Sequence, residues 1–256
     1  MKYFCCCFFI ILGLFNCASA ATGKLNVAVF LEPPYVDLVA NKLVGENIDI
    51  IHLLAKSIGL KPVFLRCPPV RCLTMLKQGQ ADMILGLSKS SPREQHFIFL
   101  NPPYLLQHQP LRFFTLKSDN LTIKNFSDLT PLLVGTLRGA LYFPLFDESQ
   151  SIKKIELTSR KQLVNMLLKG RIDTFLEREE TVLPLLSTTE YQDKFSMANY
   201  QYNKPMNSYI AISRQSKIKH YANELSQVLS KAISDGTIEK IRTKNRKKHL
   251  ENPKHK

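Results

Sequence analysis

The amino-acid sequence predicts an α/β fold in which two doubly wound lobes are joined by two crossing strands. Strand and helix patterns alternate along the chain, which is typical of parallel sheets with helices on both faces. The alternation starts afresh near residue 111, and 256 residues suffice for two units of about 100 residues each. Two amphipathic helices near the end have no strand of their own to follow, so we expect them to pack on the first unit.

The first unit opens with three strand patterns and two helix patterns. In "NIDIIHLLAKSIG", Ile48, Ile51, Leu54 (or Ala55) and Ile58 recur on one helical stripe, and Gly59 ends the pattern. The other segments are β-branched or apolar runs and a helix that stops at Gly79. The expected order is strand 24–30, helix 47–59, strand 61–67, helix 70–79 and strand 81–88.

The second unit repeats this alternation, and its clearest helix has both end signals. Ser159 is the expected N-cap and Gly170 the expected stop. We expect the chain to cross between the lobes near residues 111–116 and again near 206–212. The expected order is extended segment 111–120, strand 132–139, helix 140–148, strand 152–158, helix 159–170, strand 171–177, strand 207–214, and helices 220–236 and 237–244.

The N-terminus has the three parts of a secretory signal peptide. Lys2 precedes the apolar run "YFCCCFFIILGLF", and Ala18-Ser19-Ala20 fits a signal-peptidase site. We therefore expect cleavage after Ala20, at the end of a signal peptide 1–20, and a periplasmic protein. A retained anchor is the alternative, but the run is short for a membrane span of about 20 residues. A lipoprotein attached through Cys17 is less well supported, because bulky residues precede that cysteine.

Two cysteines remain after the signal peptide is removed, Cys67 and Cys72 in "LRCPPVRCLTML". An even number of cysteines in an oxidising compartment favours a structural disulfide. The spacing differs from that of thioredoxin-type motifs, and a zinc site would need two further ligands nearby. The predicted disulfide fixes the bend from a strand into a helix and holds Arg71 in one direction.

The charge is strongly positive, at +14 for the whole chain and +13 once Lys2 leaves with the signal peptide. Much of the excess lies in "RTKNRKKHLENPKHK", so we expect a basic, disordered tail over residues 243–256. Attraction to an acidic membrane surface is the alternative reading of this tail. We expect no nucleic-acid partner, because a secreted protein rarely meets one, and we expect a monomer.

Several segments in order resemble extracellular solute-binding proteins of family 3, the periplasmic receptors for polar amino acids and similar solutes. They are "PPYV", "GENIDIIHLLAKSIGL", "LKQGQADMILGLSKSSPRE", "NPPY", "VGTLRG", "LLKGRIDTFLE" and "SDGTIEKI". The resemblance covers roughly Lys24 to Arg242. It implies the type II periplasmic binding protein fold, with lobe 1 formed by residues 21–112 plus 207–242 and lobe 2 by residues 113–206.

The resemblance also implies ligand-binding residues in the first lobe. Ser88 and Arg93 occupy the positions that clamp the ligand carboxylate, since a guanidinium offers paired donors to two carboxylate oxygens. Tyr35 or Glu32 is expected in the pocket wall. A surface arginine and a core tyrosine are the structural alternatives for Arg93 and Tyr35.

The second lobe departs from the family pattern. Amino-acid-binding members place an aspartate for the ligand ammonium where this chain has Arg178, and Ala140 or Leu141 replaces a hydroxyl residue. Either Glu177, Glu179 or Glu180 accepts the ammonium, or the ligand is not an α-amino acid. Arg178 could also simply pair with these glutamates at the surface. A dianion, such as a dicarboxylate, is the ligand that would suit four arginines together: Arg71, Arg93, Arg138 and Arg178.

No catalytic constellation, cofactor fingerprint or metal motif is present in the sequence. The function that the resemblance implies is that of a periplasmic protein that closes on a small polar solute, an amino acid or related carboxylate, and delivers it to a membrane transporter permease. One alternative is a receptor that reports its ligand to a membrane signalling partner. A cyclohexadienyl-dehydratase-like enzyme is a weaker alternative that rests on Glu32 as a buried acid.

Overall fold

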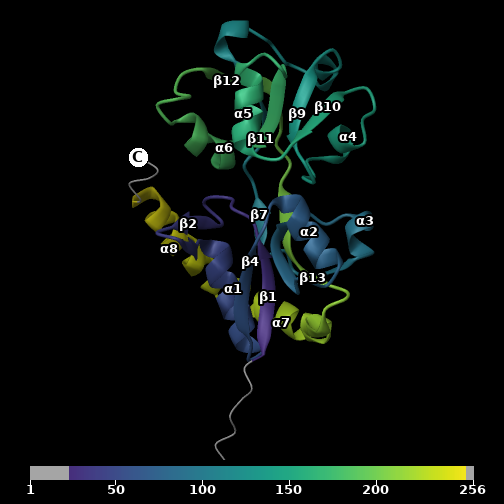
Figure 1. Ribbon diagram of the computed structural model, residues 1–256, viewed down its shortest axis with the longest axis vertical. Helices are drawn as coiled ribbons and strands as arrows, with labels where there is room; N and C mark the ends of the chain where they lie inside the picture. Colours follow the sequence, from purple (N-terminus) through teal and green to yellow (C-terminus); the bar gives the residue numbers. More distant parts are fainter. Residues whose placement is uncertain (1–22, 252–256) are drawn as a thin grey trace, which may run out of the picture.

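Two β-sheets, one in each lobe, organise the computed structural model, which describes residues 23–251 (Figure 1). The predicted signal peptide lies outside the described residues. The strands of the first lobe are β1 (Lys24–Val29), β4 (Lys61–Arg66), β5 (Met83–Leu87), β6 (Phe97–Phe99), β7 (Leu105–Gln107) and β13 (Met206–Ser213). Those of the second lobe are β8 (Leu111–Leu116), β9 (Leu133–Leu137), β10 (Lys153–Leu157), β11 (Thr174–Arg178) and β12 (Phe195–Tyr202).

Both sheets contain parallel and antiparallel strands. The strand order is β4-β1-β5-β13-β6 in the first lobe, where β7 pairs with β13, and β10-β9-β11-β8-β12 in the second. In the first lobe β1 runs parallel to β4 and β5, whereas β13 is antiparallel to its neighbours. In the second lobe β8 is antiparallel to β11 and β12. The antiparallel strands β8 and β13 are the ones that bring the chain across from the other lobe.

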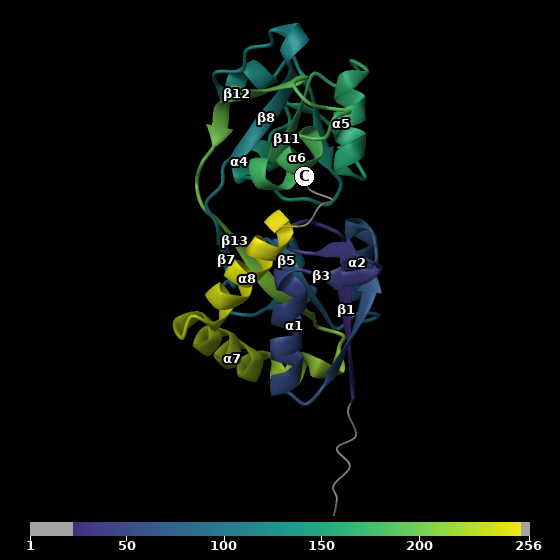
Figure 2. The same ribbon diagram turned by 90° about the vertical axis from the view of Figure 1, so that its left-hand side faces the viewer.

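Helices cover both sheets, which confirms the predicted α/β fold with two doubly wound lobes. The first lobe has α1 (Glu46–Ser57), α2 (Pro69–Lys77), α3 (Ser91–Glu94), α7 (Ala222–Ser234) and α8 (Thr237–Glu251). The second has α4 (Pro144–Asp147), α5 (Arg160–Leu168) and α6 (Glu179–Leu186). Three short 3-10 helices are η1 (Lys117–Asp119), η2 (Phe126–Leu129) and η3 (Lys217–Tyr221). Figure 2 shows α1, α7 and α8 together on the first lobe, where they contact one another. None of the helices in the described chain combines the length and apolar composition that crossing a membrane requires.

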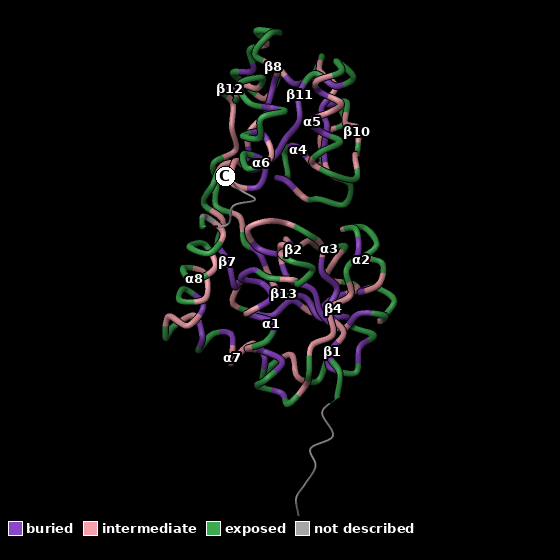
Figure 3. The backbone as a smooth tube through the Cα atoms, turned by 60° about the vertical axis from the view of Figure 1, so that its left-hand side comes forward, coloured by how far each residue is buried: buried purple, intermediate pink, exposed green. Residues whose placement is uncertain are grey.

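Each lobe has a hydrophobic core on both faces of its sheet because neighbouring strand residues point to opposite sides. In β1, Val27 belongs to the core under α1, whereas Ala28 belongs to the core under α2. In β8, Phe113 and Phe114 are likewise divided between the two cores of the second lobe. Figure 3 shows the buried backbone concentrated in the central strands of each lobe.

The chain crosses between the lobes twice, through residues 108–110 and 203–205, which join β7 to β8 and β12 to β13. The two crossings lie side by side, because β7 pairs with β13 on one side of them and β8 pairs with β12 on the other. The first crossing precedes the predicted boundary at residue 112, since β8 lies wholly in the second sheet. These short links are the natural place for a hinge.

The prediction of a helix over residues 140–148 is largely wrong, because only the four residues of α4 are helical there. Phe143 has the extended backbone angles φ −149° and ψ 150°, as expected before proline, whose ring disfavours a helical residue in front of it. The sequence reasoning also missed short or weakly periodic elements. These are the hairpin of β2 (Asp37–Val39) and β3 (Lys42–Val44), together with α3, β6, β7, α6 and β12.

The prediction of a disordered tail from residue 243 is wrong for residues 243–251, which continue helix α8. The basic side chains of α8 meet the acidic first turn of α1. Arg242 lies 3.6 Å from the buried Glu46, Lys244 lies 3.5 Å from Asp49, and Asn245 donates a hydrogen bond of 2.9 Å to Asp49. Opposite charge therefore holds the C-terminal helix on the first lobe.

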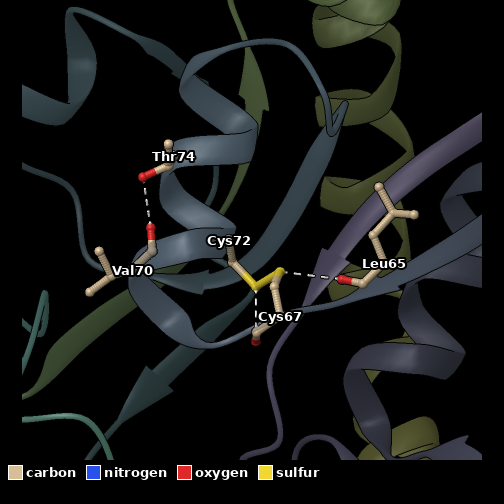
Figure 4. Close-up of a disulfide and its surroundings, with 5 residues drawn as sticks. All are labelled: Leu65, Cys67, Val70, Cys72 and Thr74. Carbon is tan, nitrogen blue, oxygen red and sulfur yellow. Dashed lines mark hydrogen bonds between the residues drawn. A yellow bond between two sulfur atoms is a disulfide. The ribbon is translucent and has the colours of Figure 1, made fainter.

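The predicted disulfide between Cys67 and Cys72 is present (Figure 4). Cys67 follows β4 and Cys72 lies in α2, with the two Cα atoms 5.4 Å apart. Both cysteines are buried in the core between α2 and the first sheet. The bond ties the end of a strand to the helix that follows it.

We expect the mature protein, starting after Ala20, to contain no free thiol before reduction, because its two cysteines are bonded to each other. Replacing both Cys67 and Cys72 with serine should lower the free energy of unfolding by about 2 kcal/mol, since the closed loop is short. Thiol titration in denaturant and urea unfolding of both proteins measure these effects. Two titratable thiols in the unreduced protein would contradict the disulfide.

Candidate functional site

A cavity of about 540 Å³ lies between the two lobes and is lined by residues of both. Much of its wall follows the carboxyl ends of β1, β5, β9, β10 and β11. In open α/β sheets these strand ends meet at one edge, where ligands usually bind. The corresponding wall residues are 30–33 and 35, 86–88, 137–142, 158–160, 177–178 and 181.

The cavity wall includes most of the residues that the sequence nominated for the ligand. They are Glu32, Tyr35, Ser88, Arg93, Arg138 and Arg178, together with Ala140 and Leu141. Arg71 is an exception, because it is exposed on α2 and does not line this cavity. Pro69 and Leu73, four residues apart on the same helix face, line the wall in its place.

Arg93 is a wall cation whose hydrogen-bond partners are uncharged. Its Nη1 donates to the carbonyl oxygen of Ser88 at 2.8 Å, and its Nη2 donates across the cavity to that of Gly139 at 2.9 Å. Among the described residues no carboxylate lies within ion-pair distance of this guanidinium. Burial lowers the pKa of Arg93, and nearby Asp147 partly opposes that effect. Arginine stays protonated in proteins, so the cavity holds an unpaired positive charge.

Arg178 is a second buried cation of this kind, in the second lobe, with 8% of its surface exposed. Its Nη1 donates to the carbonyl oxygen of Gln109 at 2.7 Å, and its Nη2 lies 3.0 Å from the sulfur of Met206. Within the described chain it forms no ion pair, so the predicted alternative of surface pairing with its glutamate neighbours is not observed. Burial lowers the pKa of Arg178, whereas nearby Tyr35, Glu180, Glu177 and Glu32 raise it.

Arg160 is the site residue that the sequence reasoning missed. Its Nη2 lies 2.8 Å from Oε1 of Glu32 in the first lobe, and its Nε lies 3.3 Å from Oε2 of Glu177 in the second. Glu177 also accepts a hydrogen bond of 3.0 Å from the hydroxyl of Thr181. Arg160 begins α5 just after the N-cap Ser159, so its place after a strand could have drawn attention to it.

Burial and charge both shift pKa values in the ion triad, which consists of Arg160, Glu32 and Glu177. Burial raises the pKa of Glu32, and the cation of Arg160 partly opposes that effect. Burial alone would lower the pKa of Arg160, but Glu177 and Glu32 together outweigh it and raise this pKa. Arg160 therefore keeps its positive charge and pairs with both glutamates.

Tyr35 forms another contact between the lobes, since its hydroxyl donates to Oε1 of Glu180 at 2.5 Å. Tyr35 is 4% exposed, and burial, followed by the charge of Glu180, raises its pKa. Among residues 23–251, polar contacts thus join the lobes across the cavity between Arg160 and Glu32, between Tyr35 and Glu180 and between Arg93 and Gly139. The structure is therefore a closed arrangement of the lobes.

The chemistry of the wall suits a small ligand with negative charge, because the guanidinium groups of Arg93 and Arg178 have no anionic partner in the part of the chain that the structure describes. Glu179, another acid nominated for an ammonium group, pairs with Arg112 and is not part of the wall. In the described part of the chain, no three His, Cys, Asp or Glu side chains are grouped closely enough to hold a metal ion.

Comparison with known proteins identifies relatives of the same kind. The probable histidine-binding protein of Campylobacter jejuni is 27% identical over 179 residues, 67% of this chain and 67% of that protein. The histidine-binding periplasmic protein of Escherichia coli is 24% identical over 254 residues, covering 90% of this chain and 92% of that protein. An amino acid ABC transporter substrate-binding protein from Streptococcus pneumoniae, solved with L-arginine, superposes with a TM-score of 0.71 at 22% identity, over 90% of this chain and 97% of that one.

The strongest evidence for the family of this chain is its match to a model of that family's sequences. The model of the bacterial extracellular solute-binding proteins, family 3, matches residues 25–248, which include both sheets and the cavity between them. The fold of two lobes, the cavity at the strand ends and this match agree with one another. The chain belongs to the bacterial extracellular solute-binding proteins, family 3.

Proposed function

We propose that this protein is the periplasmic receptor of a membrane transporter and that it closes its two lobes over a small solute bearing a carboxylate. The observation that carries the proposal is Arg93, which lines the cavity between the lobes and has no carboxylate partner among the described residues. A guanidinium presents paired donors that match the two oxygens of a carboxylate. The relatives named for histidine, and the neighbour solved with L-arginine, also bind solutes that contain this group.

Closure is the step that converts binding into a signal for the transporter. The solute first meets the first lobe, where Arg93 holds its carboxylate and Ser88 lies beside it. The second lobe then turns about residues 108–110 and 203–205 and covers the solute. Water leaves the cavity, so each charged contact becomes stronger at the lower local dielectric. The closed form is populated because the solute binds it more tightly than the open form.

The role of the permease follows from this closure. A transporter that recognises both lobes at once would accept the closed receptor and not the open one. We expect the predicted signal peptide to direct the mature protein to the periplasm, the compartment that such a permease faces. The cavity volume of about 540 Å³ suits one small molecule, and pockets for small ligands generally measure about 300–1,000 Å³.

Replacing Arg93 with alanine is expected to abolish stabilisation by the solute, because the carboxylate loses its cation. A solute present at about 100 times its Kd stabilises the folded protein by about 2.7 kcal/mol. The melting temperature, measured with a panel of amino acids and dicarboxylates, should therefore rise for the wild type and stay unchanged for Arg93→Ala.

Arg71→Ala is the matched control, since it removes the same charge from an exposed position outside the cavity wall. This variant should keep the full ligand-induced shift. An undiminished shift in Arg93→Ala would remove Arg93 from the site, and the absence of any shift in the wild type would count against the proposed function.

A further inference from the structure

We infer that the solute carries two carboxylate groups and no ammonium group, with one carboxylate bound at Arg93 in the first lobe and the other at Arg178 in the second. This inference rests on the proposed function and specifies the class of ligand. It depends on three features of the cavity: the acids that already have partners, the cations that lack a carboxylate partner, and the apolar side chains in the wall.

An ammonium group needs an anionic or carbonyl acceptor, and the acids near the cavity are already occupied. Glu32 and Glu177 share Arg160, and Glu177 also accepts from Thr181. Glu180 accepts the hydroxyl of Tyr35 at 2.5 Å. An α-amino acid would have to break one of these contacts to place its ammonium, and it would still face the neighbouring guanidinium groups.

The cations of the wall, in contrast, outnumber its acids. The charged residues that line the cavity are Arg93, Arg138, Arg160 and Arg178 with Glu32 and Glu177. Arg138 pairs with Glu156 at 3.6 Å, and Arg160 is shared by Glu32 and Glu177. The excess that remains among the described residues is the two charges of Arg93 and Arg178, which match a ligand with two negative charges. A zwitterionic ligand would leave this excess in place inside a closed cavity.

Arg178 has donors left for such a ligand. A guanidinium carries five N–H donors, and the contacts of Arg178 with Gln109 and Met206 use two of them. The thioether of Met206 is a weak acceptor, so it does little to offset the burial of a charge. A ligand carboxylate is the group that would complete the hydrogen bonding and neutralise the charge.

Apolar side chains supply much of the cavity wall. Leucines reach the cavity from both lobes, and they are Leu31, Leu73, Leu87, Leu105, Leu111, Leu137, Leu141 and Leu185. A hydrocarbon spacer between two carboxylates would cover this surface, whereas a polar side chain would lose its water there without a partner. The features together describe a dicarboxylate with a hydrocarbon spacer.

The test compares three matched series of compounds on the mature wild-type protein by calorimetry. The series are unbranched dicarboxylates from succinate to pimelate, monocarboxylates of the same chain lengths, and ω-amino acids in which an ammonium replaces one carboxylate. L-Histidine, L-arginine and L-glutamate complete the set. We expect one dicarboxylate to bind about tenfold or more tightly than its monocarboxylate and ω-amino counterparts, as the loss of a charged hydrogen bond predicts.

Variants then assign the second carboxylate. Arg178→Gln should weaken the dicarboxylate about tenfold or more and leave the monocarboxylate unchanged. Arg178→Lys should recover part of the loss, because lysine restores the positive charge but not the paired donors of the guanidinium. Thermal unfolding without ligand shows whether the variants fold; if they do not, the selectivity of the wild type alone decides.

The outcomes separate this inference from the proposed function. Tighter binding of an α-amino acid than of any dicarboxylate would overturn the inference and leave a solute receptor in place. Equal affinity for matched dicarboxylates and monocarboxylates would do the same, as would equal losses for both in Arg178→Gln. Failure of every compound to bind would overturn the inference and count against the proposed function as well.

Discussion

Replacing Arg160 with alanine is expected to weaken solute binding about a hundredfold and to favour the open arrangement of the lobes. The change would leave Glu32 and Glu177 in the closed cavity without the cation that they share. Removing one partner of a buried ion pair costs about 3–5 kcal/mol, and we take the lower end because Arg160 keeps 20% of its side chain exposed. Opening the lobes returns the two carboxylates to water, so the cost falls mainly on the closed form.

Calorimetry and small-angle scattering measure the two parts of this prediction. The affinity of the variant should fall, and its radius of gyration without solute should rise above that of the wild type. Lys161→Ala is the matched control, since it removes one charge from an exposed neighbour on the same helix. Unchanged affinity in Arg160→Ala would show that closure does not depend on the triad.

The pH dependence of Arg160→Ala provides a second check. Burial raises the pKa of Glu32, so the closed form takes up a proton more readily than the open, hydrated form. A group that binds more protons in the closed form favours closure as the pH falls. The affinity deficit of Arg160→Ala should therefore shrink as the pH is lowered towards the ordinary pKa of a glutamate. A deficit that grows over this range would contradict the explanation.

Replacing Gly45 with alanine is expected to lower the free energy of unfolding by about 3 kcal/mol or more, which is near the upper end for single substitutions. Gly45 has φ +124°, a region that is essentially restricted to glycine. An added Cβ would lie 2.3 Å from the carbonyl oxygen and 2.7 Å from the carbonyl carbon of Tyr35. These are backbone atoms that cannot move without shifting the loop, and Asn47 already donates to the same oxygen at 3.1 Å.

Urea unfolding checks this prediction, and the other end of the same helix offers the control. Gly59 follows α1 with φ +68°, but its added Cβ would meet nothing within 4 Å. Gly59→Ala should therefore lower the free energy of unfolding by only about 1–2 kcal/mol, the cost of placing alanine in a left-handed backbone conformation. Because the loop from Glu32 to Tyr35 also forms cavity wall, Gly45→Ala should lose solute binding in addition. Equal costs for the two variants would contradict the steric argument.

The sequence by itself determined the order of the main elements and much of the cavity wall. Long periodic segments such as α1 and β-branched runs such as β1 were predictable, because they depend on local spacing of apolar residues. The Cys67–Cys72 bond was predictable from the compartment and the small number of cysteines. Arg93 and Arg178 line the cavity because they lie near the carboxyl ends of strands, Arg93 after β5 of the first sheet and Arg178 at the end of β11 of the second.

Other features were decided only when distant segments came together. Short strands such as β6 and β7 have too few residues for a periodic signal and exist because β13 pairs with them. The basic C-terminal segment is helical because Glu46 and Asp49 of α1 offer it partners almost 200 residues earlier in the chain. Local charge density alone cannot show that such partners exist.

The ion triad of the cavity is the clearest example of a feature that only the tertiary structure determines. Arg160 and Glu32 are separated by 128 residues and lie in different lobes. The place of Arg160 just after a strand and the N-cap Ser159 could mark it as a cavity residue, but nothing in the local sequence predicts Glu32 as its partner. Its partners are set by how the two crossing segments let the lobes close, and that geometry is a property of the assembled fold.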